Sequence, residues 1–191
     1  MSGLLSVGFF LFSVVFSLLT FILWTRFALR FFAISSLYPL SQTMVKLTNP
    51  WVNPLSQLFK KLKINIKRYD WPCLTLIFLI EIVKYAILSQ FFPGAGLSLV
   101  QIFVFAAIEM ILEPCNLLFY AIIIRVILSW INPGVQNPLA NLCFFVTEPL
   151  LFQIRKRLPM MAGLDFSPLV ALIILKIIPL FITASMPLQL L

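Results

Sequence analysis

The sequence predicts an all-α membrane protein with four transmembrane helices, arranged as two hairpins of a parallel repeat with basic amphipathic interfacial segments between spans. Three observations predict this fold class: the composition, four long apolar stretches and an internal repeat. Hydrophobic residues make up 62% of the 191 residues and charged residues only 10%, whereas about a quarter of the residues in a soluble domain are charged. A water-soluble fold of this size could not cover so much apolar surface.

The internal repeat predicts the domain organisation. One constant shift along the chain carries Arg26, Pro39, Thr48 and Pro50 onto Arg125, Pro138, Thr147 and Pro149. Each copy consists of an apolar stretch, a Pro-marked basic segment and a second apolar stretch, so the repeat defines a structural unit. We therefore expect a first two-span unit at residues 1–96 and a second at residues 97–191.

The first unit contributes two expected spans. A spanning helix needs about 20 mainly apolar residues, and residues 4–32 meet this length with Arg26 and Arg30 near their end. Because no charge precedes Arg26, the positive n-region of a signal peptide is missing and we expect a retained span. The second span is expected at about residues 72–92, where a Pro-Gly-Ala-Gly turn ends it.

The second unit contributes the other two spans. Residues 97–131 form an apolar stretch that is too long for one straight span at 1.5 Å per residue. Either Pro114 kinks this helix, or an interfacial stretch precedes the span proper. The fourth span is expected from about Ser167 to Leu188 and contains Pro179.

Positive residues predict the orientation of the spans. Both long connections carry Lys and Arg clusters, whereas the two chain ends and the turn at residues 93–96 carry none. Because cytoplasmic loops are enriched in Lys and Arg, we expect both connections in the cytoplasm and both termini on the outer side. The two units then share one orientation, which makes the duplication parallel rather than inverted.

The connections themselves are expected to form short amphipathic helices in the cytoplasmic interface. Apolar residues recur at helical spacing at Leu55, Leu58, Phe59 and Leu62, and again at Leu150, Leu151, Ile154 and Leu158. The basic residues expected to contact anionic headgroups or a partner are Lys60, Lys61, Lys63, Arg155, Lys156 and Arg157. A solvated charge run that only sets the topology is the alternative. Because the clusters flank spans, we expect no direct binding of nucleic acid.

Several ionisable residues fall inside the apolar stretches, where charges are costly. They are Glu81, Lys84, Glu109, Glu113 and Lys176. Glu81 and Lys84 are three residues apart and can pair within one helix, and a cross-helix pair of Glu113 with Lys176 is plausible from their depth. These groups either line a proton or cation path or form neutral pairs that fix helix docking, and the near balance of charge favours docking.

The repeated arginines are predicted to act as latches. Asp70 is the natural partner of Arg26, and Glu148 or Asp165 is the natural partner of Arg125. The segments Asp70-Trp-Pro and Asp165-Phe-Ser167-Pro168 each open a span, where Asp or Ser can cap free backbone N–H groups and Pro suits the first turn.

Motifs for catalysis and for metal binding are missing from the sequence. Histidine is absent and the three cysteines have no Cys-x-x-Cys spacing, which removes the commonest general base and a zinc site. There is no phosphate-binding Gly-Lys-Ser/Thr loop, no Gly-x-Ser-x-Gly and no potassium-channel filter sequence. We therefore expect no enzyme, no metal and no cofactor.

Five segments together resemble the YggT family of bacterial and plastid membrane proteins. These are Arg125-Val-Ile-Leu-Ser-Trp-Ile-Asn-Pro, Asn-Pro138-Leu, Val-Thr147-Glu148-Pro149-Leu, Ile-Arg155-Lys156-Arg157-Leu-Pro and Gly-Leu-Asp165-Phe-Ser167-Pro168. The resemblance covers essentially the whole chain as two units. The first copy departs from the pattern, because Asn49 stands where Glu148 does and no serine follows Asp70.

The resemblance implies an integral protein of the bacterial inner membrane, with both termini periplasmic. Bacterial members of the family are linked to osmotic-stress tolerance and potassium homeostasis and often neighbour cell-division genes. Plastid relatives are linked to nucleoid distribution and cytochrome assembly, although the absence of histidine speaks against haem ligation by this chain. We expect a non-enzymatic scaffold or assembly factor that binds lipid, a membrane-protein partner or a second copy. Transport of potassium or protons is the alternative.

Overall fold

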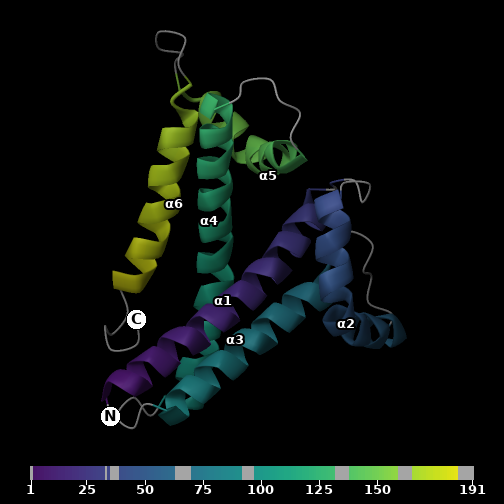
Figure 1. Cartoon of the computed structure of the whole chain (residues 1–191), viewed down its shortest axis with the longest axis vertical. Helices are drawn as coiled ribbons and strands as arrows, with labels where there is room; N and C mark the ends of the chain where they lie inside the picture. Colours follow the sequence, from purple (N-terminus) through teal and green to yellow (C-terminus); the bar gives the residue numbers. More distant parts are fainter. Residues whose placement is uncertain are drawn as a thin grey trace. The chain divides into compact units, whose positions relative to one another are not determined.

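The computed structural model is all-α, as the sequence predicts (Figure 1). It describes residues 2–32, 34, 39–62, 70–91, 97–131, 138–158 and 165–184. Within these ranges the elements are α1 (Ser2–Phe31), α2 (Pro39–Lys61), α3 (Trp71–Phe91), α4 (Leu99–Ile131), α5 (Pro138–Arg155) and α6 (Ser167–Ala184).

Within the described residues, four of the helices are long and apolar enough to cross a membrane. They are Val7–Phe31, Trp71–Gln90, Leu99–Ile131 and Ser167–Ala184, and each coincides with one of the four predicted spans. The third span is one continuous helix of 33 residues that contains Pro114. A proline removes one backbone hydrogen bond, and the helix continues through Pro114.

The helices between the spans are longer than the short segments predicted from the sequence. α2 has 23 residues and contains Pro50 and Pro54, and α5 has 18 residues and contains Pro149. Both begin at a repeat-equivalent proline, at the first helical position, where the missing N–H costs nothing. α2 continues through its internal prolines and bends (Figure 1), as helices commonly do at proline.

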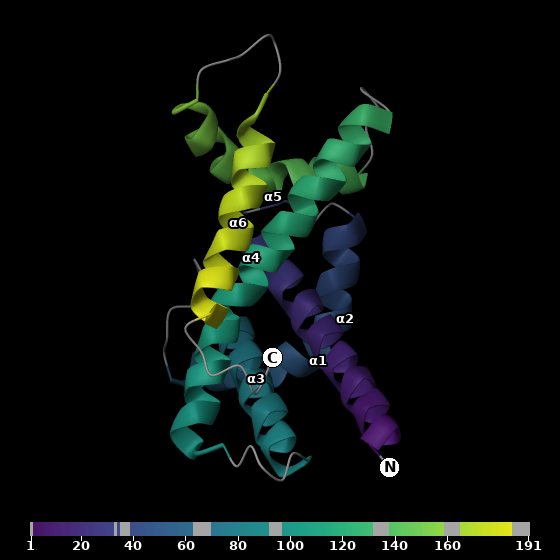
Figure 2. The same ribbon diagram turned by 90° about the vertical axis from the view of Figure 1, so that its left-hand side faces the viewer.

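The chain divides into two compact units that are described separately. Unit 1 comprises Met1–Phe27 and Met44–Met110, and unit 2 comprises Ala28–Thr43 and Ile111–Leu191. The divisions fall inside α1, α2 and α4, whereas the predicted unit boundary at residues 96 and 97 follows the sequence repeat. In unit 2, α6 runs beside the C-terminal half of α4 and α5 lies across their ends (Figures 1 and 2).

Each unit has its own buried apolar contacts. In unit 2, Ile122, Leu151, Ala171 and Leu175 form a cluster that joins α4, α5 and α6. In unit 1, the buried residues include Leu23, Val52, Cys73 and Ile77, and the Cys73 thiol donates to the Leu23 carbonyl over 3.4 Å. Because lipid tails are as apolar as these side chains, close packing and hydrogen bonds hold such helices together.

Candidate functional site

Arg26 lies at the centre of a buried polar site in unit 1. Its side chain connects α1 to α2 and to the residue that precedes α3: Nε donates to Asp70 Oδ2 at 3.3 Å and Nη1 donates to Thr48 Oγ1 at 2.7 Å. Nη1 also lies 2.9 Å from Asn49 Oδ1. Arg26 is 7% exposed and Asp70 is 2% exposed, so the predicted pair is present and removed from solvent.

The hydroxyl of Thr48 is oriented to accept from Arg26 by a hydrogen bond within its own helix. Its hydroxyl donates to the Met44 carbonyl at 2.6 Å, one helical turn earlier, as threonines inside helices commonly do. With its proton used in this way, the hydroxyl oxygen keeps lone pairs free to accept from Arg26. The guanidinium therefore fastens the amphipathic helix α2 to the span α1.

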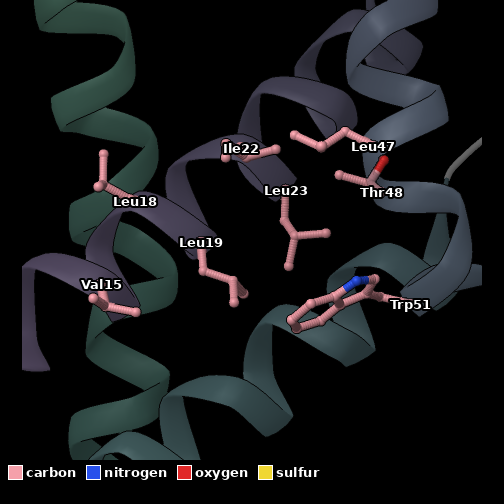
Figure 3. Close-up of a pocket in the computed structure, with 8 residues that line it drawn as sticks. All are labelled: Val15, Leu18, Leu19, Ile22, Leu23, Leu47, Thr48 and Trp51. Atoms are coloured by element: carbon pink, nitrogen blue, oxygen red, sulfur yellow. The ribbon is translucent and has the colours of Figure 1, made fainter.

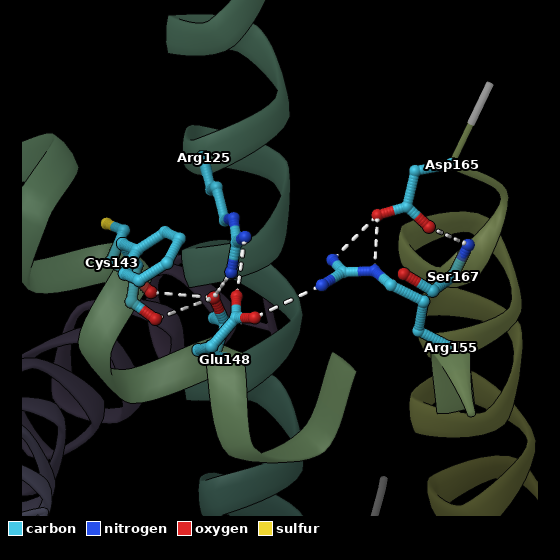
Figure 4. A network of polar contacts seen from close by, with 8 residues as sticks. Arg125, Cys143, Glu148, Arg155, Asp165 and Ser167 are labelled. Carbon is cyan, nitrogen blue, oxygen red and sulfur yellow. Dashed lines mark hydrogen bonds and ion pairs between the residues drawn. The ribbon is translucent and has the colours of Figure 1, made fainter. Parts of the chain in front are cut away.

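Unit 2 repeats this geometry at the equivalent residues (Figure 4). Arg125 Nη1 donates to Thr147 Oγ1 at 2.9 Å, and Nη2 donates to Glu148 Oε2 at 2.7 Å. The Thr147 hydroxyl in turn donates to the Cys143 carbonyl at 2.7 Å. The Arg125 guanidinium also lies 4.4 Å from the centre of the Phe144 ring. We name these two arrangements the Arg26 latch and the Arg125 latch.

The Arg125 latch extends towards α6 through a second arginine. Arg155 Nη1 donates to Glu148 Oε1 at 3.1 Å, while its Nε and Nη2 donate to Asp165 Oδ2 at 3.1 and 2.7 Å. Of the two carboxylates predicted for Arg125, Glu148 takes the direct bond and Asp165 pairs with Arg155 instead (Figure 4). The alternating charges link α4, α5 and the start of α6.

The start of α6 is capped by the aspartate. Asp165 Oδ1 accepts from the backbone N–H of Ser167 at 2.9 Å, which satisfies one of the free donors at the helix start. Of the two residue types that the sequence offered as a cap, the aspartate therefore forms it, and the buried Ser167 hydroxyl oxygen has no hydrogen-bond partner within the described residues. Pro168 follows in the first turn.

Hydrogen bonding shifts the pKa of both ends of the outer ion pair. The bond to Asp165 raises the pKa of the Arg155 guanidinium above its ordinary value. Partial burial acts to raise the pKa of Asp165, but bonds from Ser167 and Arg155 outweigh it, and the net pKa lies below its ordinary value. Both groups are therefore charged at neutral pH.

The Arg125 latch contains one more acid and one more arginine than the Arg26 latch. Asn49 takes the place of Glu148, and Ser56 takes the place of Arg155 under the same repeat. Unit 1 thus keeps one arginine and one aspartate in its latch, while unit 2 keeps two arginines and two acids. Both networks balance their charges. Asn49 was not predicted as a site residue, although its equivalence to Glu148 could have indicated it.

A second polar cluster lies within the spans of unit 1. Lys84 Nζ lies 2.9 Å from Glu81 Oε2 and 3.2 Å from Glu109 Oε1, and the Tyr85 hydroxyl donates to Glu109 Oε1 at 2.8 Å. The predicted pair of Glu81 with Lys84 is present. Lys84 also joins α3 to α4 through Glu109, a contact that the sequence did not predict.

Lys176 is placed against an aromatic ring in unit 2. Its ammonium nitrogen lies 4.3 Å from the centre of the Phe119 ring, a distance at which a cation is attracted to the ring face. The suggested pair of Glu113 with Lys176 stays a prediction.

The predicted basic contact residues occupy different settings. Lys60, Lys61, Lys156 and Arg157 are exposed, whereas Lys63 lies outside the described residues. Arg155 is half-buried in the Arg125 latch, so its charge is already bound to acids of the chain. The exposed members of this predicted set therefore lie at the end of α2 and in the turn that follows α5.

The apolar faces of α2 and α5 also differ. On α2, Leu58 and Leu62 are exposed at 57% and 62%, which agrees with an apolar face turned outward. On α5, the predicted apolar residue Leu151 is fully buried and packs against the spans of its own unit. The large exposed side chains of α5 include Phe144, Phe145 and Phe152.

An apolar groove of about 320 Å³ lies in unit 1 beside the Arg26 latch (Figure 3). The α1 side chains that line it include Val15, Leu19 and Leu23, and α2 contributes Thr48 and Trp51. Its polar lining is minor, so the groove has the surface of a site for an apolar group rather than for a charged substrate. Among the described residues, no group of three or more Cys, Asp or Glu side chains is placed to hold a metal ion.

Comparison with known proteins identifies similar sequences over nearly the whole chain. The family model described as CCB3/YggT matches residues 5–91 and again residues 102–186. An uncharacterized protein of Pseudomonas aeruginosa is 33% identical over 183 residues, which cover 95% of this chain and 91% of that protein. The uncharacterized protein YggT of Escherichia coli strain K12 is 28% identical over 88% of this chain and 85% of its own length. No solved structure matches the chain.

Proposed function

Because the chain belongs to the CCB3/YggT family, we propose that it is a non-enzymatic, multi-pass protein of the bacterial inner membrane that serves as a scaffold or assembly factor. In this proposal the protein supports envelope or osmotic physiology, and its cytoplasmic face binds anionic lipid headgroups. Both termini are periplasmic and both connections between the spans are cytoplasmic.

The observation that carries this proposal is the repeated arginine latch. In each unit an arginine near the end of a span binds the threonine of the following amphipathic helix, at 2.7 Å in unit 1 and at 2.9 Å in unit 2. A buried, hydrogen-bonded arginine fixes the direction in which a helix leaves its span. An amphipathic helix held in this way can present a fixed surface to the membrane or to a partner, which supports the proposed scaffold role.

The surface of α2 fits the plane of the membrane interface. Leu47, Trp51 and Leu58 are exposed at 56%, 53% and 57%, and Lys60 and Lys61 form the end of the same helix. Apolar and aromatic side chains insert at the level of the headgroups while lysines attract anionic lipid. Polybasic segments contribute about 1 kcal/mol of binding per Lys or Arg near such a surface.

The proposal is tested by removing the exposed cations. In the variant, Lys60, Lys61, Lys156 and Arg157 are replaced by glutamine, and Arg155 is left in place because it belongs to the Arg125 latch. Wild type and variant are reconstituted in nanodiscs of mixed phosphatidylcholine and phosphatidylglycerol, and the lipids retained after extraction are measured by native mass spectrometry. We expect the variant to lose most of its enrichment in phosphatidylglycerol.

The matched control keeps the charge and changes the side chains. It exchanges Lys60, Lys61 and Lys156 for arginine and Arg157 for lysine, and it should retain phosphatidylglycerol like the wild type. Equal enrichment in phosphatidylglycerol in the wild type and the glutamine variant would contradict the lipid-binding proposal. If lipid retention is unchanged but a co-purifying membrane protein is lost, the surface serves a protein partner instead.

A second candidate function, ion transport, is favoured by the cluster of Glu81, Lys84 and Glu109 within the spans. Ionisable groups at such positions commonly mark proton or ion pathways. The test uses purified protein in sealed vesicles, challenged with potassium and proton gradients. Flux that Glu109→Gln abolishes would favour transport, and flux no higher than in empty vesicles would exclude it.

A further inference from the structure

The polar cluster inside the spans of unit 1 contains more carboxylates than cations. Glu81 and Glu109 both bond to Lys84, at 2.9 and 3.2 Å, and the hydroxyl of Tyr85, which is neutral, lies 2.8 Å from Glu109. If both carboxyl groups were ionised, the cluster would carry one net negative charge within an apolar helix pair. A net charge in such surroundings is strongly unfavourable.

The other charged groups described in unit 1 do not cancel this charge. Arg26 is bonded to Asp70 in the latch, and Lys46, Lys60 and Lys61 of α2 are exposed. Within the described residues, both ion pairs of the cluster involve Lys84, which bonds to two acids. One ammonium therefore faces two carboxyl groups.

A second observation locates the site. Glu81 is 1% exposed, and while its Oε2 bonds to Lys84, its Oε1 is buried without a hydrogen-bond partner in the described part of the chain. A carboxylate oxygen that is buried without a donor is less favourable than the oxygen of a neutral carboxyl group, because neither solvent nor a hydrogen bond stabilises its share of the charge. The oxygen is thus placed to carry a proton.

We propose that Glu81, Lys84 and Glu109 form a binding site for one proton, which is carried by Glu81, within the membrane-spanning part of unit 1. The number of bound protons equals the number of carboxyl groups minus the number of ammonium groups. The proton comes from water, and no other reactant is required. The site deepens the transport candidate but stands without it, because a proton that never crosses the membrane would still be bound.

Infrared spectroscopy of the full-length protein in lipid tests the site. A protonated carboxylic acid has a carbonyl-stretch band that is separate from those of carboxylates, and the band shifts when the protein is transferred to D₂O. We expect the wild type to show this band at neutral pH. Difference spectra against each variant remove any constant contribution from other acids, such as Glu113.

Three variants change the proton count in different directions. Glu81→Gln and Glu109→Gln each leave one acid for one ammonium, so both should lose the band. Lys84→Met leaves two acids without a cation, so the band should about double. Circular dichroism of each variant checks that its helix content is preserved, and the wild-type spectrum gives a result even if a variant does not fold.

Two results would overturn the proposal. If the wild-type band is absent, or if both glutamine variants keep it unchanged, the carboxyl groups are ionised and no proton is held. If addition of potassium or sodium at constant pH removes the band, the site takes a metal cation rather than a proton. The vesicle assay is independent, since an intact band without flux excludes transport and leaves the proton site standing.

Discussion

Asn49 and Glu148 occupy equivalent positions in the two units, and each accepts a hydrogen bond from the arginine of the preceding span. The bond from Arg26 to Asn49 is 2.9 Å long and the bond from Arg125 to Glu148 is 2.7 Å long. The neutral amide and the carboxylate therefore hold the same place in the same structure. The neighbouring charges differ accordingly. In unit 1 Asp70 pairs directly with Arg26, whereas in unit 2 a second arginine, Arg155, also bonds to Glu148.

The Arg26 latch should contribute more to stability than the Arg125 latch. Arg26→Ala removes the arginine that pairs with the buried Asp70, and we expect a loss of about 3–5 kcal/mol of unfolding free energy. Arg125 and Glu148 have side chains exposed at 19% and 27%, so Arg125→Ala should lose about 1–3 kcal/mol. Unfolding in mixed micelles of increasing SDS content measures both. Equal losses would contradict the difference in burial.

The shared acceptor Glu148 should couple the two arginines of unit 2. Glu148→Asn removes an acceptor from Arg125 and from Arg155, and Arg155→Ser removes the charge that Glu148 balances. We expect the double variant, which copies the residues of unit 1, to lose about 0.5–3 kcal/mol less stability than the sum of the single variants. An additive double variant would show that the two substitutions act independently.

The threonine hydroxyls should each contribute about 1 kcal/mol through their paired bonds. Thr48→Val and Thr147→Val keep the shape but remove the oxygen that accepts from the arginine. Thr48→Ser keeps this oxygen and serves as the control. The unfolding free energy in mixed micelles should fall in the valine variants and change little with serine. A loss of the same size with serine would assign the effect to packing of the methyl group.

Acid should weaken the outer ion pair of unit 2. The pKa of Asp165 is lower in the folded protein than its ordinary value, so its contribution is complete above the ordinary value of about 3.9. As the pH falls through that value, the unfolded chain binds a proton first and the contribution is lost. The difference in melting temperature between wild type and Asp165→Asn should therefore shrink only below about pH 5, as the pH falls towards the lower pKa of the folded protein. A constant difference would show that the charge of Asp165 does not stabilise the fold.

The proposed topology can be tested with single cysteines. After the native Cys73, Cys115 and Cys143 are replaced by alanine, a new cysteine is introduced by Ser2→Cys or by Lys61→Cys. In intact cells a membrane-impermeant thiol reagent should label the cysteine at position 2 and not the one at position 61. Labelling of position 61 alone would reverse the orientation that the positive residues predict.

The spans and the repeat could be predicted because they depend on local composition. Length and hydropathy located four helices to within a few residues, and the constant shift between the copies indicated that Arg26 and Arg125 share one role. The pair of Arg26 with Asp70 followed from their places at the ends of consecutive spans. Such features require no knowledge of how the helices are rotated.

Features that depend on helix rotation could not be predicted. The contact between Lys84 and Glu109 joins two helices, and nothing in the local sequence shows which faces meet. Leu151 was assigned to a membrane-facing stripe, but tertiary packing places it in the core of unit 2. Arg155 was grouped with the headgroup-binding cations because Glu148 and Asp165, which it contacts, were assigned to Arg125 instead.

Because α4 is one continuous helix, its length can be compared with the thickness of the bilayer. A helix of 33 residues is about 50 Å long, while the hydrocarbon layer measures about 30 Å. Tilt alone would require about 53°, beyond the 0–40° usual for such helices. Trp130, 81% exposed at the C-terminal end, belongs to a residue type that anchors at the headgroups. The hydrophobic mismatch therefore falls at the Leu99 end, and it is accommodated where the helix extends past the acyl chains, kinks at Pro114 or locally thickens the lipid around it.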